Sequence, residues 1–597
     1  MVSLMSGNEA VARGAYEAGV TYAAAYPGTP STEILEELAR YSAVIAEWAP
    51  NEKVAVECAL GASIAGGRAL AAMKMVGVNV AADPLFSSAY AGVNGGLVIV
   101  SADDPGLHSS QNEQDNRLYA PFVKLAMLEP ADSQEAKDMV KAAFDISESN
   151  DIPVLFRMTT RVCHSRSLVA TSPRIAVPPR AYPANLLKFN LVPAMARRHR
   201  ARLEVRLKQL EAYAETCPFN RVEWNSAEIG IITSGIAYQY AREAFGEEAS
   251  YLKLGFTHPL PKAKIREFAA RVARLYIVEE LEPYLENFVR GLGIPCIGKD
   301  KIPNMYELNP SIVAGALLGG HAREIESRPA AVPPRPPVLC AGCPHRGFFY
   351  ELGKYAKRHN LIISGDIGCY ALGMNDPLNA LDLCICMGAA PSMAHGAQKV
   401  LEAGNSGTRT VAVIGDSTFF HTGVPALINA VYNKSNTITC ILDNRTTAMT
   451  GQQDNPGSGT TLQSEATAAI DIEALVRALG VQNVRVVNPL DLDKMHQALA
   501  WGLAAVGPSV IVCKWPCNLK RMSSDESNEY MHGHARLAVA AERCTGCRMC
   551  LNVGCPALSF DDDAGKARID SGACNGCGVC GQVCSWNAVV SEEAAHV

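Results

Sequence analysis

The sequence predicts an α/β protein with several domains built on parallel sheets and a small cysteine-rich domain at its C-terminal end. Short apolar runs that end in polar turns alternate with helical stretches through most of the 597 residues, which is typical of buried parallel strands joined by helices. From about residue 535 this alternation gives way to closely spaced cysteines. Because a single core stops growing at about 250 to 300 residues, the chain is long enough for three or four domains.

The composition favours an enzyme-like chain. The net charge of −6 and the lack of a long basic run do not favour nucleic acid or an anionic membrane surface as a partner. No apolar run reaches the roughly twenty residues that cross a bilayer, and no signal precedes Asn8, so we expect a cytoplasmic protein. The 20 cysteines cluster at CxxC spacings, and in a chain of this size we interpret them as metal ligands rather than disulfides.

Changes in composition divide the chain into six segments. A proline-rich and basic stretch predicts a linker with a surface helix, and a second proline-dense stretch predicts a stiff extended connector. The middle α/β segment holds no convincing catalytic cluster, so we expect a structural or subunit-contact role for it. The segments are 1–180, first α/β domain; 181–226, linker and surface helix; 227–327, middle α/β domain; 328–337, connector; 338–520, second α/β domain; and 535–597, cysteine-rich domain.

Two apolar runs in the second α/β domain, Val411–Ile414 and Ile438–Leu442, end in polar residues. Between them, His421–Tyr432 has room for about three helical turns, which predicts a βαβ unit. Asp416 and Asn444 would then both lie at carboxyl ends of strands, where open α/β sheets bind ligands. Their oxygens suit a Mg²⁺ ion that is already held by a diphosphate. An ordinary turn with a solvated aspartate is the alternative for this motif alone.

The first domain contains a loop in a normal ligand position, Pro27–Glu33, between a strand-like stretch and a helix expected at Glu33–Tyr41. Ser31 or Thr32 is expected to cap that helix. Farther on, a buried-strand pattern leads into the polar stretch His108–Arg117. Such a stretch is usually a surface loop, although at the end of a strand it can equally face a substrate or a partner chain.

The stretch Asn51–Leu70 is rich in Ala and Gly, and a helix this poor in bulk can pack closely against another backbone or a flat ligand. It carries two acids, Glu52 and Glu57. For a glutamate at an arbitrary helix position, a solvated side chain is the common outcome.

The C-terminal cysteines give the most specific signal. Two runs of CxxCxxC, each followed by a fourth cysteine, match two-cluster bacterial ferredoxins, in which that fourth cysteine ligates the other cluster. Zinc sites are an alternative, but zinc pairs do not need three such steps in a row. The first run has one residue more than usual before its fourth cysteine, and Ser585 replaces the usual proline. The expected [4Fe–4S] ligands are Cys544, Cys547, Cys550 and Cys584 for one cluster and Cys555, Cys574, Cys577 and Cys580 for the other.

Four further cysteines lie at the ends of predicted strands or in turns of the second α/β domain, where they can converge. They are Cys340 and Cys343 in a CxxC pair, Cys369, and Cys517. A lone CxxC pair is a weak signal because buried free cysteines are common. A third cluster is therefore a hypothesis.

With these residues in view, the chain resembles the thiamine-dependent 2-oxoacid:ferredoxin oxidoreductases, and within them the α subunits of indolepyruvate ferredoxin oxidoreductases. The resemblance covers nearly the whole chain. It implies that 1–180 is a pyrimidine-binding thiamine domain, 338–520 a diphosphate- and Mg²⁺-binding thiamine domain, and 227–327 a domain like the transketolase C-terminal domain. The motifs that carry it are Tyr26–Glu33, Asn51–Lys53, His108–Arg117, Cys340–Arg346, Gly415–Ser417, Met449–Gly451 and the ferredoxin-like tail.

The resemblance also implies residue roles in the first domain. Thiamine enzymes place a glutamate nine residues before a glycine on a helix of the pyrimidine domain, and Glu52 and Gly61 fit this spacing, with Glu57 as the second candidate. A carboxyl group that is shielded from water and bonded to the pyrimidine N1′ favours the imino tautomer, whose nitrogen deprotonates C2 of the thiazolium. Thr29 would hydrogen-bond the 2-oxo acid.

In the second domain, the resemblance implies that Asp416, Asn444 and the carbonyl of Thr446 hold Mg²⁺. Related enzymes hold a proximal cluster with cysteines that resemble Cys340, Cys343, Cys369 and Cys517, which strengthens the hypothesis of a third cluster. The residues expected to contact thiamine diphosphate are Gly415, Asp416, Ser417, Asn444, Thr446, Gly368 and Cys369.

The implied activity is oxidative decarboxylation of an arylpyruvate such as indolepyruvate or phenylpyruvate, with coenzyme A and ferredoxin as acceptors. A smaller β subunit and a doubled heterodimer are expected. The alternatives are another 2-oxo acid, the reductive direction, non-oxidative decarboxylation to an aldehyde, and an electron-transfer or scaffold subunit with its chemistry on a partner. Non-oxidative decarboxylation would leave the ferredoxin tail without a purpose, and Glu52, Asp416 and Asn444 argue against a scaffold.

Overall fold

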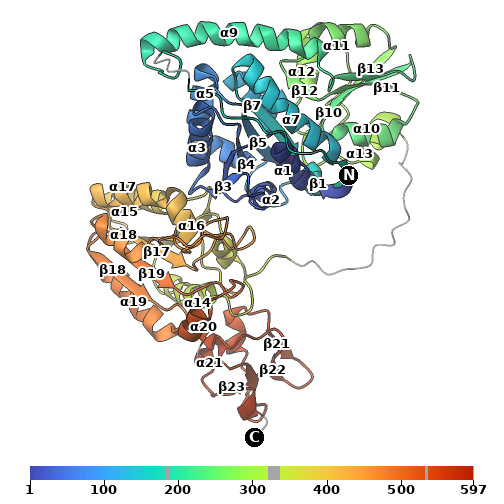
Figure 1. Cartoon of the computed structure of the whole chain (residues 1–597). Coiled ribbons are helices and arrows are strands. Elements are labelled where there is room, and N and C mark those ends of the chain that lie inside the picture. Colours follow the sequence, from blue (N-terminus) through green and yellow to red (C-terminus); the bar gives the residue numbers. More distant parts are fainter. Residues whose placement is uncertain (183–186, 320–335, 532–534, 596–597) are drawn as a thin grey trace. The chain divides into compact units, whose positions relative to one another are not determined.

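The computed structural model describes residues 1–182, 187–319, 336–531 and 535–595. The chain forms two compact units, Met1–Ala330 and Ala331–Val597 (Figure 1). Residues 328–335 of the predicted proline-rich connector lie outside the described residues. Over the part of the chain that is described, no helix is both long and apolar enough to cross a membrane.

The first unit is built on a seven-stranded sheet whose strands are all parallel to their neighbours except β12. β5 and β7 are buried along their whole length, and β5 confirms the strand expected from the apolar run that precedes the polar stretch. In sheet order, the strands are β12 (Phe256–His258), β6 (Ala126–Leu128), β7 (Val154–Thr159), β5 (Leu97–Asp103), β4 (Ala69–Lys74), β2 (Tyr22–Ala25) and β3 (Ile45–Trp48).

Helices cover both faces of this sheet (Figure 1). The stretch 51–70 is not one helix, because Gly66 adopts a φ of +99° that ends the helix and Ala69 already begins β4. The longest helix, α9, forms the surface helix predicted within 181–226. One face carries α1 (Gly7–Glu17), α2 (Thr32–Leu38) and α7 (Ser133–Asn150), and the other carries α3 (Glu52–Ile64), α4 (Met75–Val80) and α5 (Ala82–Ala91), with α9 (Pro193–Thr216) beside α5.

The middle segment forms a four-stranded sheet in the order β13-β10-β11-β9, whose edge strand β9 comes from the end of the preceding segment. Its strand β12 pairs with β6, so the middle segment extends the first sheet rather than standing apart from it. The elements are β9 (Arg221–Glu223), β10 (Ile229–Ser234), β11 (Ser250–Leu254), β13 (Arg274–Val278), α10 (Ala237–Phe245), α11 (Lys262–Ala269), α12 (Tyr284–Gly291) and α13 (Pro310–Leu318).

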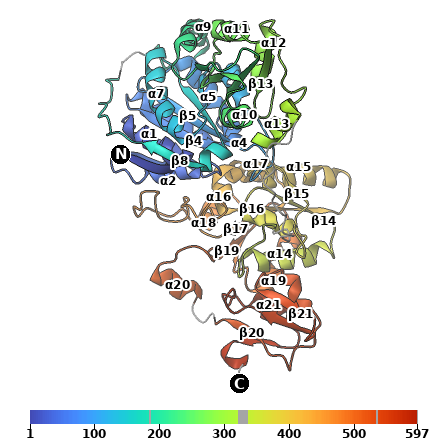
Figure 2. The same ribbon diagram turned by 90° about the vertical axis from the view of Figure 1, so that its right-hand side faces the viewer.

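The second unit is built on a six-stranded parallel sheet. One face packs on α14 (His345–Ala356) and α19 (Leu492–Ala504), and the other on α17 (Val424–Tyr432) and α18 (Ile472–Ala478), with α15 (Ala390–Ala403) beside α17 (Figure 2). In sheet order, the strands are β15 (Leu383–Cys384), β14 (Leu361–Gly365), β16 (Arg409–Gly415), β17 (Ile438–Asp443), β19 (Ser509–Lys514) and β18 (Asn483–Val487).

The predicted βαβ unit is confirmed, with one difference. The helix begins earlier than expected, because a short turn of α16 (Asp416–Thr418) starts directly at the end of β16 and leads through a wider turn at Phe419–Gly423 into α17. Asp416 is thus held by both the end of a strand and the first turn of a helix.

The cysteine-rich segment folds as two small antiparallel strand pairs, and a short helical turn contains the last cysteine of each CxxCxxC run. Val553, Val579 and Val583 pack against Leu490 and Leu492 next to α19, so this segment shares a core with the sheet of its unit. The elements are α20 (Ser524–Met531), β20 (Leu537–Val539) paired with β23 (Val589–Ser591), β21 (Leu558–Asp561) paired with β22 (Lys566–Ile569), the 3₁₀ turn η4 (Met549–Val553) and α21 (Val579–Val583).

Candidate thiamine, metal and iron–sulfur sites

The structure brings the three predicted Mg²⁺ ligands together at the carboxyl ends of β16 and β17. Asp416 is 3% exposed and Asn444 is 7% exposed. The N–H of Thr446 donates to Asn444 Oδ1 at 3.2 Å, and the N–H groups of Ser417 and Thr446 also lie against the Asp416 carboxylate. Burial, together with the charge of the nearby Asp443, raises the pKa of Asp416 to about 8. A cation here would favour the ionised carboxylate, so these hard oxygen donors fit Mg²⁺.

Sequence reasoning missed the turn that closes over this site. Asn455 Nδ2 donates to Asp416 Oδ2 at 3.1 Å, and the hydroxyl of Thr447 donates to Ser417 Oγ at 2.8 Å. The turn is fixed in place because the Thr446 hydroxyl donates to the carbonyl of Gln453 at 3.1 Å. No local pattern marks Asn455 as part of the site, since its contact with Asp416 spans 39 residues.

A second strand end, that of β14, meets the first through the ring of Tyr370. A Cβ atom on Gly415 would lie 2.7 Å from this ring and one on Gly368 would lie 2.3 Å from it, so both positions require glycine. The Tyr370 hydroxyl donates to Asp366 Oδ1, and the N–H of Ala390 donates to Oδ2 at 3.1 Å. Burial raises the pKa of Asp366 to about 7. The signal for Asp366 was available, because Gly–Asp follows an apolar strand here just as it does at Asp416.

The four cysteines of the hypothetical third cluster converge beside this site. Burial, together with the charges of Cys517 and Cys340, raises the pKa of the Cys369 thiol to about 11. Burial also raises the pKa of the Cys343 thiol, and its neighbours Cys369 and Cys517 contribute to this shift. The N–H of Cys517 donates to the carbonyl of Asn444 at 2.9 Å. The cysteine set therefore lies next to the proposed metal ligands within one unit.

The C-terminal cysteines fall into the two sets predicted from their spacing. Burial raises the pKa of Cys550, and so do its neighbours Cys584, Cys544 and Cys547. The second set of four lines one cavity. Within the described residues, no group of three or more His, Cys, Asp or Glu side chains is placed to hold a single metal ion. The cavity is lined by Cys555, Cys574, Cys577 and Cys580, together with Ala341 and Gly342 of the CxxC loop and neighbouring apolar residues.

Arg346 ties the CxxC loop to the cysteine-rich segment. Its guanidinium donates to the carbonyl of Cys340 at 2.9 Å, to that of Val553 at 3.3 Å, and to that of Gly554. A Cβ atom on Gly342 would lie 1.8 Å from the side chain of Asn575. The third cysteine set and the Cys555 set are thus neighbours.

In the first unit, Glu52 is the first residue of α3, where the side chain of Asn51 accepts from the N–H of Val54 at 2.9 Å and caps the helix. Glu52 is 5% exposed. A Cβ atom on Gly77 would lie 2.6 Å from Glu52 Cγ, so the glutamate packs directly on the backbone of α4. Glu57 is exposed and pairs with a lysine, which leaves Glu52 as the shielded carboxyl group of this helix.

Thr29 lies half-buried in a loop that other side chains hold. Asn8 Nδ2 donates to the carbonyl of Pro30 at 2.6 Å. The predicted cap is wrong in its detail: Ser31 occupies the N-cap position of α2, but its hydroxyl donates to the carbonyl of Gly28 at 2.9 Å instead of accepting from the helix. The loop is stabilised in preference to the helix end.

The polar stretch 108–117 is a surface loop only in its first part. Asp115, Asn116 and Arg117 are buried, and Arg117 Nη1 donates to Glu279 Oε2 of the middle segment at 2.7 Å. The expectation of a surface loop fails at this end because the arginine is neutralised by Asp115 within the stretch and by Glu279 far along the chain.

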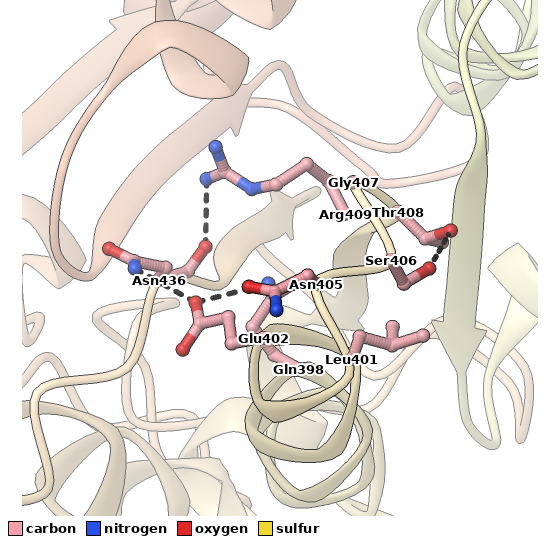
Figure 3. Close-up of a pocket in the computed structure, with 9 residues that line it drawn as sticks. All are labelled: Gln398, Leu401, Glu402, Asn405, Ser406, Gly407, Thr408, Arg409 and Asn436. Carbon is pink, nitrogen blue, oxygen red and sulfur yellow. Dashed lines mark hydrogen bonds between the residues drawn. The ribbon is translucent and has the colours of Figure 1, made fainter.

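The open pocket in Figure 3 lies at the opposite, amino-terminal edge of the second sheet and contains none of the predicted site residues. Its carboxylate, Glu402, accepts from Asn436 at 2.8 Å and from Gln398 at 3.1 Å. These polar groups satisfy one another, so the pocket is not a candidate for the active site.

Three family models match separate parts of the chain. Residues 13–207 match "Pyruvate flavodoxin/ferredoxin oxidoreductase, thiamine diP-bdg". Residues 366–513 match "Thiamine pyrophosphate enzyme, C-terminal TPP binding domain". Residues 536–585 match "4Fe-4S dicluster domain".

Fold, sites and family matches together define a thiamine-diphosphate-dependent 2-oxoacid:ferredoxin oxidoreductase that carries iron–sulfur clusters. Proteins named indolepyruvate oxidoreductase subunit IorA are similar to this chain along nearly their whole length. The one from Archaeoglobus fulgidus is 41% identical over 98% of this chain and 96% of its own chain. The one from Thermococcus kodakarensis is 40% identical, also over 98% of this chain and 96% of its own chain. The chain belongs to the family of indolepyruvate ferredoxin oxidoreductase α subunits. The predicted fold class is confirmed.

Proposed function

We propose that the enzyme oxidises an arylpyruvate, such as indolepyruvate or phenylpyruvate, with coenzyme A as the acyl acceptor and ferredoxin as the electron acceptor. The products are an aryl-acetyl-CoA, CO₂ and reduced ferredoxin. The observation that carries the proposal is the likeness, 41% identity over 98% of the chain, to a relative named for indolepyruvate. That relative is named as a subunit, which supports a smaller β subunit as partner, and we propose that the heterodimer is doubled.

When bound, thiamine diphosphate supplies an electron sink for the loss of CO₂ and then gives up two electrons. In the proposal, Asp416, Asn444 and the carbonyl of Thr446 hold Mg²⁺ and through it the diphosphate. The same strand ends are lined by four further residues that contact the cofactor, Gly415, Ser417, Gly368 and Cys369. The tight packing of both glycines on Tyr370 supports a close approach of the cofactor to their backbone.

Glu52 is proposed to hold the pyrimidine N1′ and keep the cofactor in the tautomer that removes the C2 proton, and Thr29 to donate to the keto oxygen of the substrate. The burial of Glu52 supports this role, because a carboxyl group shielded from water forms the stronger hydrogen bond. Glu52→Gln is expected to abolish the exchange of the C2 proton of bound thiamine with D₂O. Glu57→Gln, a matched change on the exposed side of the same helix, is the control.

Three [4Fe–4S] clusters are proposed to carry the electrons outward. Cys340, Cys343, Cys369 and Cys517 hold the proximal cluster beside the Mg²⁺ ligands, and the contact between the CxxC loop and the Cys555 set supports transfer to the two ferredoxin-type clusters. Anaerobically purified protein should then contain about twelve iron atoms per thiamine, and about eight would exclude the proximal cluster. Substituting Cys517 by serine should remove about four of the twelve.

Product analysis tests the reaction itself. The chain is purified anaerobically with its β subunit and incubated with indolepyruvate, coenzyme A and oxidised ferredoxin. Mass spectrometry is expected to find the aryl-acetyl-CoA in an amount that matches the ferredoxin reduced, two electrons for each CO₂. Formation of the aryl acetaldehyde with ferredoxin left oxidised would instead establish non-oxidative decarboxylation.

A further inference from the structure

Lys74 lies beside the proposed substrate loop at the carboxyl edge of the first sheet. It is the last residue of β4, which runs parallel to β2 with Ala72 opposite Ala25, so the ends of the two strands meet. A Cβ atom on Gly28 would lie 3.1 Å from Lys74 Cβ. The lysine stem thus packs on the backbone of Gly28, directly before Thr29.

Lys74 is half-buried, and its ammonium group has little negative charge to balance it. Its Nζ donates to the backbone carbonyl of Ser109, and within the described residues it forms no ion pair. Burial lowers the pKa of Lys74, and the charge of Asp104 only opposes this. A partly buried ammonium without a paired carboxylate is an unusual arrangement, and ionisable groups of this kind in a ligand-binding position are candidate functional residues.

Asp104 does not need Lys74 as a partner. It already accepts from the N–H of Ser109 at 2.9 Å, from the hydroxyl of Ser110 at 2.6 Å and from that of Thr160 at 2.7 Å. Asp104 therefore holds the 109–110 turn, and that turn presents the Ser109 carbonyl that orients the lysine. The two remaining N–H donors of the ammonium are left for another acceptor.

The segment that follows Lys74 is in contact with the other predicted catalytic group. Gly77, three residues farther along, packs against Glu52 Cγ, as described above. One short segment, 74–77, thus touches both the Gly28–Thr29 loop and the glutamate proposed to activate the cofactor. A cation at this point of the first unit lies among the residues that the proposed reaction uses.

We propose that Lys74 binds the carboxylate of the 2-oxo acid while Thr29 donates to its keto oxygen. This inference rests on the proposed function and adds a residue that recognises the carboxylate, the group next to the keto carbon in every 2-oxo acid. Because this carboxylate leaves as CO₂, its contact with the ammonium belongs to the bound ground state. Lys74 is therefore expected to govern the Michaelis constant for the oxo acid much more than kcat.

The test compares Lys74→Met with Lys208→Met, which removes an exposed ammonium from α9. The Michaelis constant for phenylpyruvate is expected to rise about 30- to 100-fold in the first variant, because a charge-assisted hydrogen bond is lost. It is expected to be unchanged in the second. The Michaelis constant for coenzyme A should stay unchanged in both, which separates the oxo acid from the acyl acceptor as the ligand of Lys74.

Two binding readouts complete the test. Wild-type enzyme should bind phenylpyruvate more tightly than phenylacetone, the same ketone without a carboxylate, and Lys74→Met should remove this preference. Exchange of the C2 proton of bound thiamine should be intact in Lys74→Met. An unchanged Michaelis constant and preference, or a loss of thiamine from the variant, would overturn the assignment of Lys74 alone. A wild-type enzyme that binds no 2-oxo acid would overturn the proposed function itself.

Discussion

Replacing Arg117 by methionine is expected to destabilise the first unit by about 3 to 5 kcal/mol, the cost of removing one partner from a buried charge network. Its side chain is 1% exposed. The guanidinium binds the Asp115 carboxylate, Glu279 Oε2 at 2.7 Å, and the carbonyls of Glu280 at 2.6 Å and Glu282 at 3.0 Å. Methionine preserves most of the stem but removes the buried positive charge that these acceptors face. Lysine keeps the charge without the planar fork, so Arg117→Lys should be destabilised as well.

Hydrogen–deuterium exchange on the intact chain measures this effect within one unit. Peptides that cover β5 and β7 should exchange more than about 100-fold faster in Arg117→Met, since about 1.4 kcal/mol corresponds to a factor of ten. Peptides that cover β16 and β17 serve as the internal reference, and Arg198→Met on the exposed side of α9 is the matched variant. An acceleration of less than about threefold, equal to that of Arg198→Met, would refute the claim that the network stabilises this unit.

Three other changes test separate parts of the structure. Burial lowers the folded-state pKa of His258 to about 4, so its contribution to stability is complete above pH 6.5 and is lost as pH falls toward 4, by at most about 3 kcal/mol. The Tm of His258→Asn should therefore fall less than the Tm of the wild type over this pH range, and parallel Tm curves would contradict this prediction. Gly77→Ala places a methyl group against Glu52 and should slow C2-proton exchange of bound thiamine more than about tenfold at a stability cost of about 1 to 3 kcal/mol, whereas unchanged exchange would separate Glu52 from the cofactor. Arg346→Met removes the donor to four carbonyls, two at the CxxC loop and two in the cysteine-rich segment, and should lower the iron content below that of Lys354→Met, an exposed-side change on the same helix. Equal iron in both would show that Arg346 does not secure the clusters.

The parts of the second unit that local sequence determines were predictable. β16 and β17 are short apolar runs that end at an acid or an amide, and parallel pairing alone brings Asp416 near Asn444. The cysteine sets follow from spacing, because two CxxC steps in a row with a fourth cysteine close behind leave few geometries for a cluster. Asp366 follows a glycine at the end of an apolar run, as Asp416 does. Asp366 could therefore have been predicted as a site residue from the sequence.

What remained hidden depends on partners far along the chain. Arg117 is typical of a loop residue in the sequence, because one of the two acids that neutralise it, Glu279, lies 162 residues farther on. The same holds for Lys74, which looks like an ordinary strand end until Gly28 and the Ser109 carbonyl are placed against it. Ser31 shows that even a local prediction can fail, since a hydroxyl at an N-cap position can donate to a loop carbonyl instead of accepting from the helix N–H groups.

The most direct measurement of the central claim is the anaerobic reduction of ferredoxin by the purified chain with its β subunit. The rate is compared across indolepyruvate, phenylpyruvate, pyruvate and 2-oxoglutarate, with and without coenzyme A. Reduction is expected to depend on coenzyme A and to be fastest by far with the two aryl acids. If thiamine and iron are both bound and no oxo acid reduces ferredoxin, the proposed reaction is wrong; if pyruvate or 2-oxoglutarate is preferred, the arylpyruvate assignment is wrong.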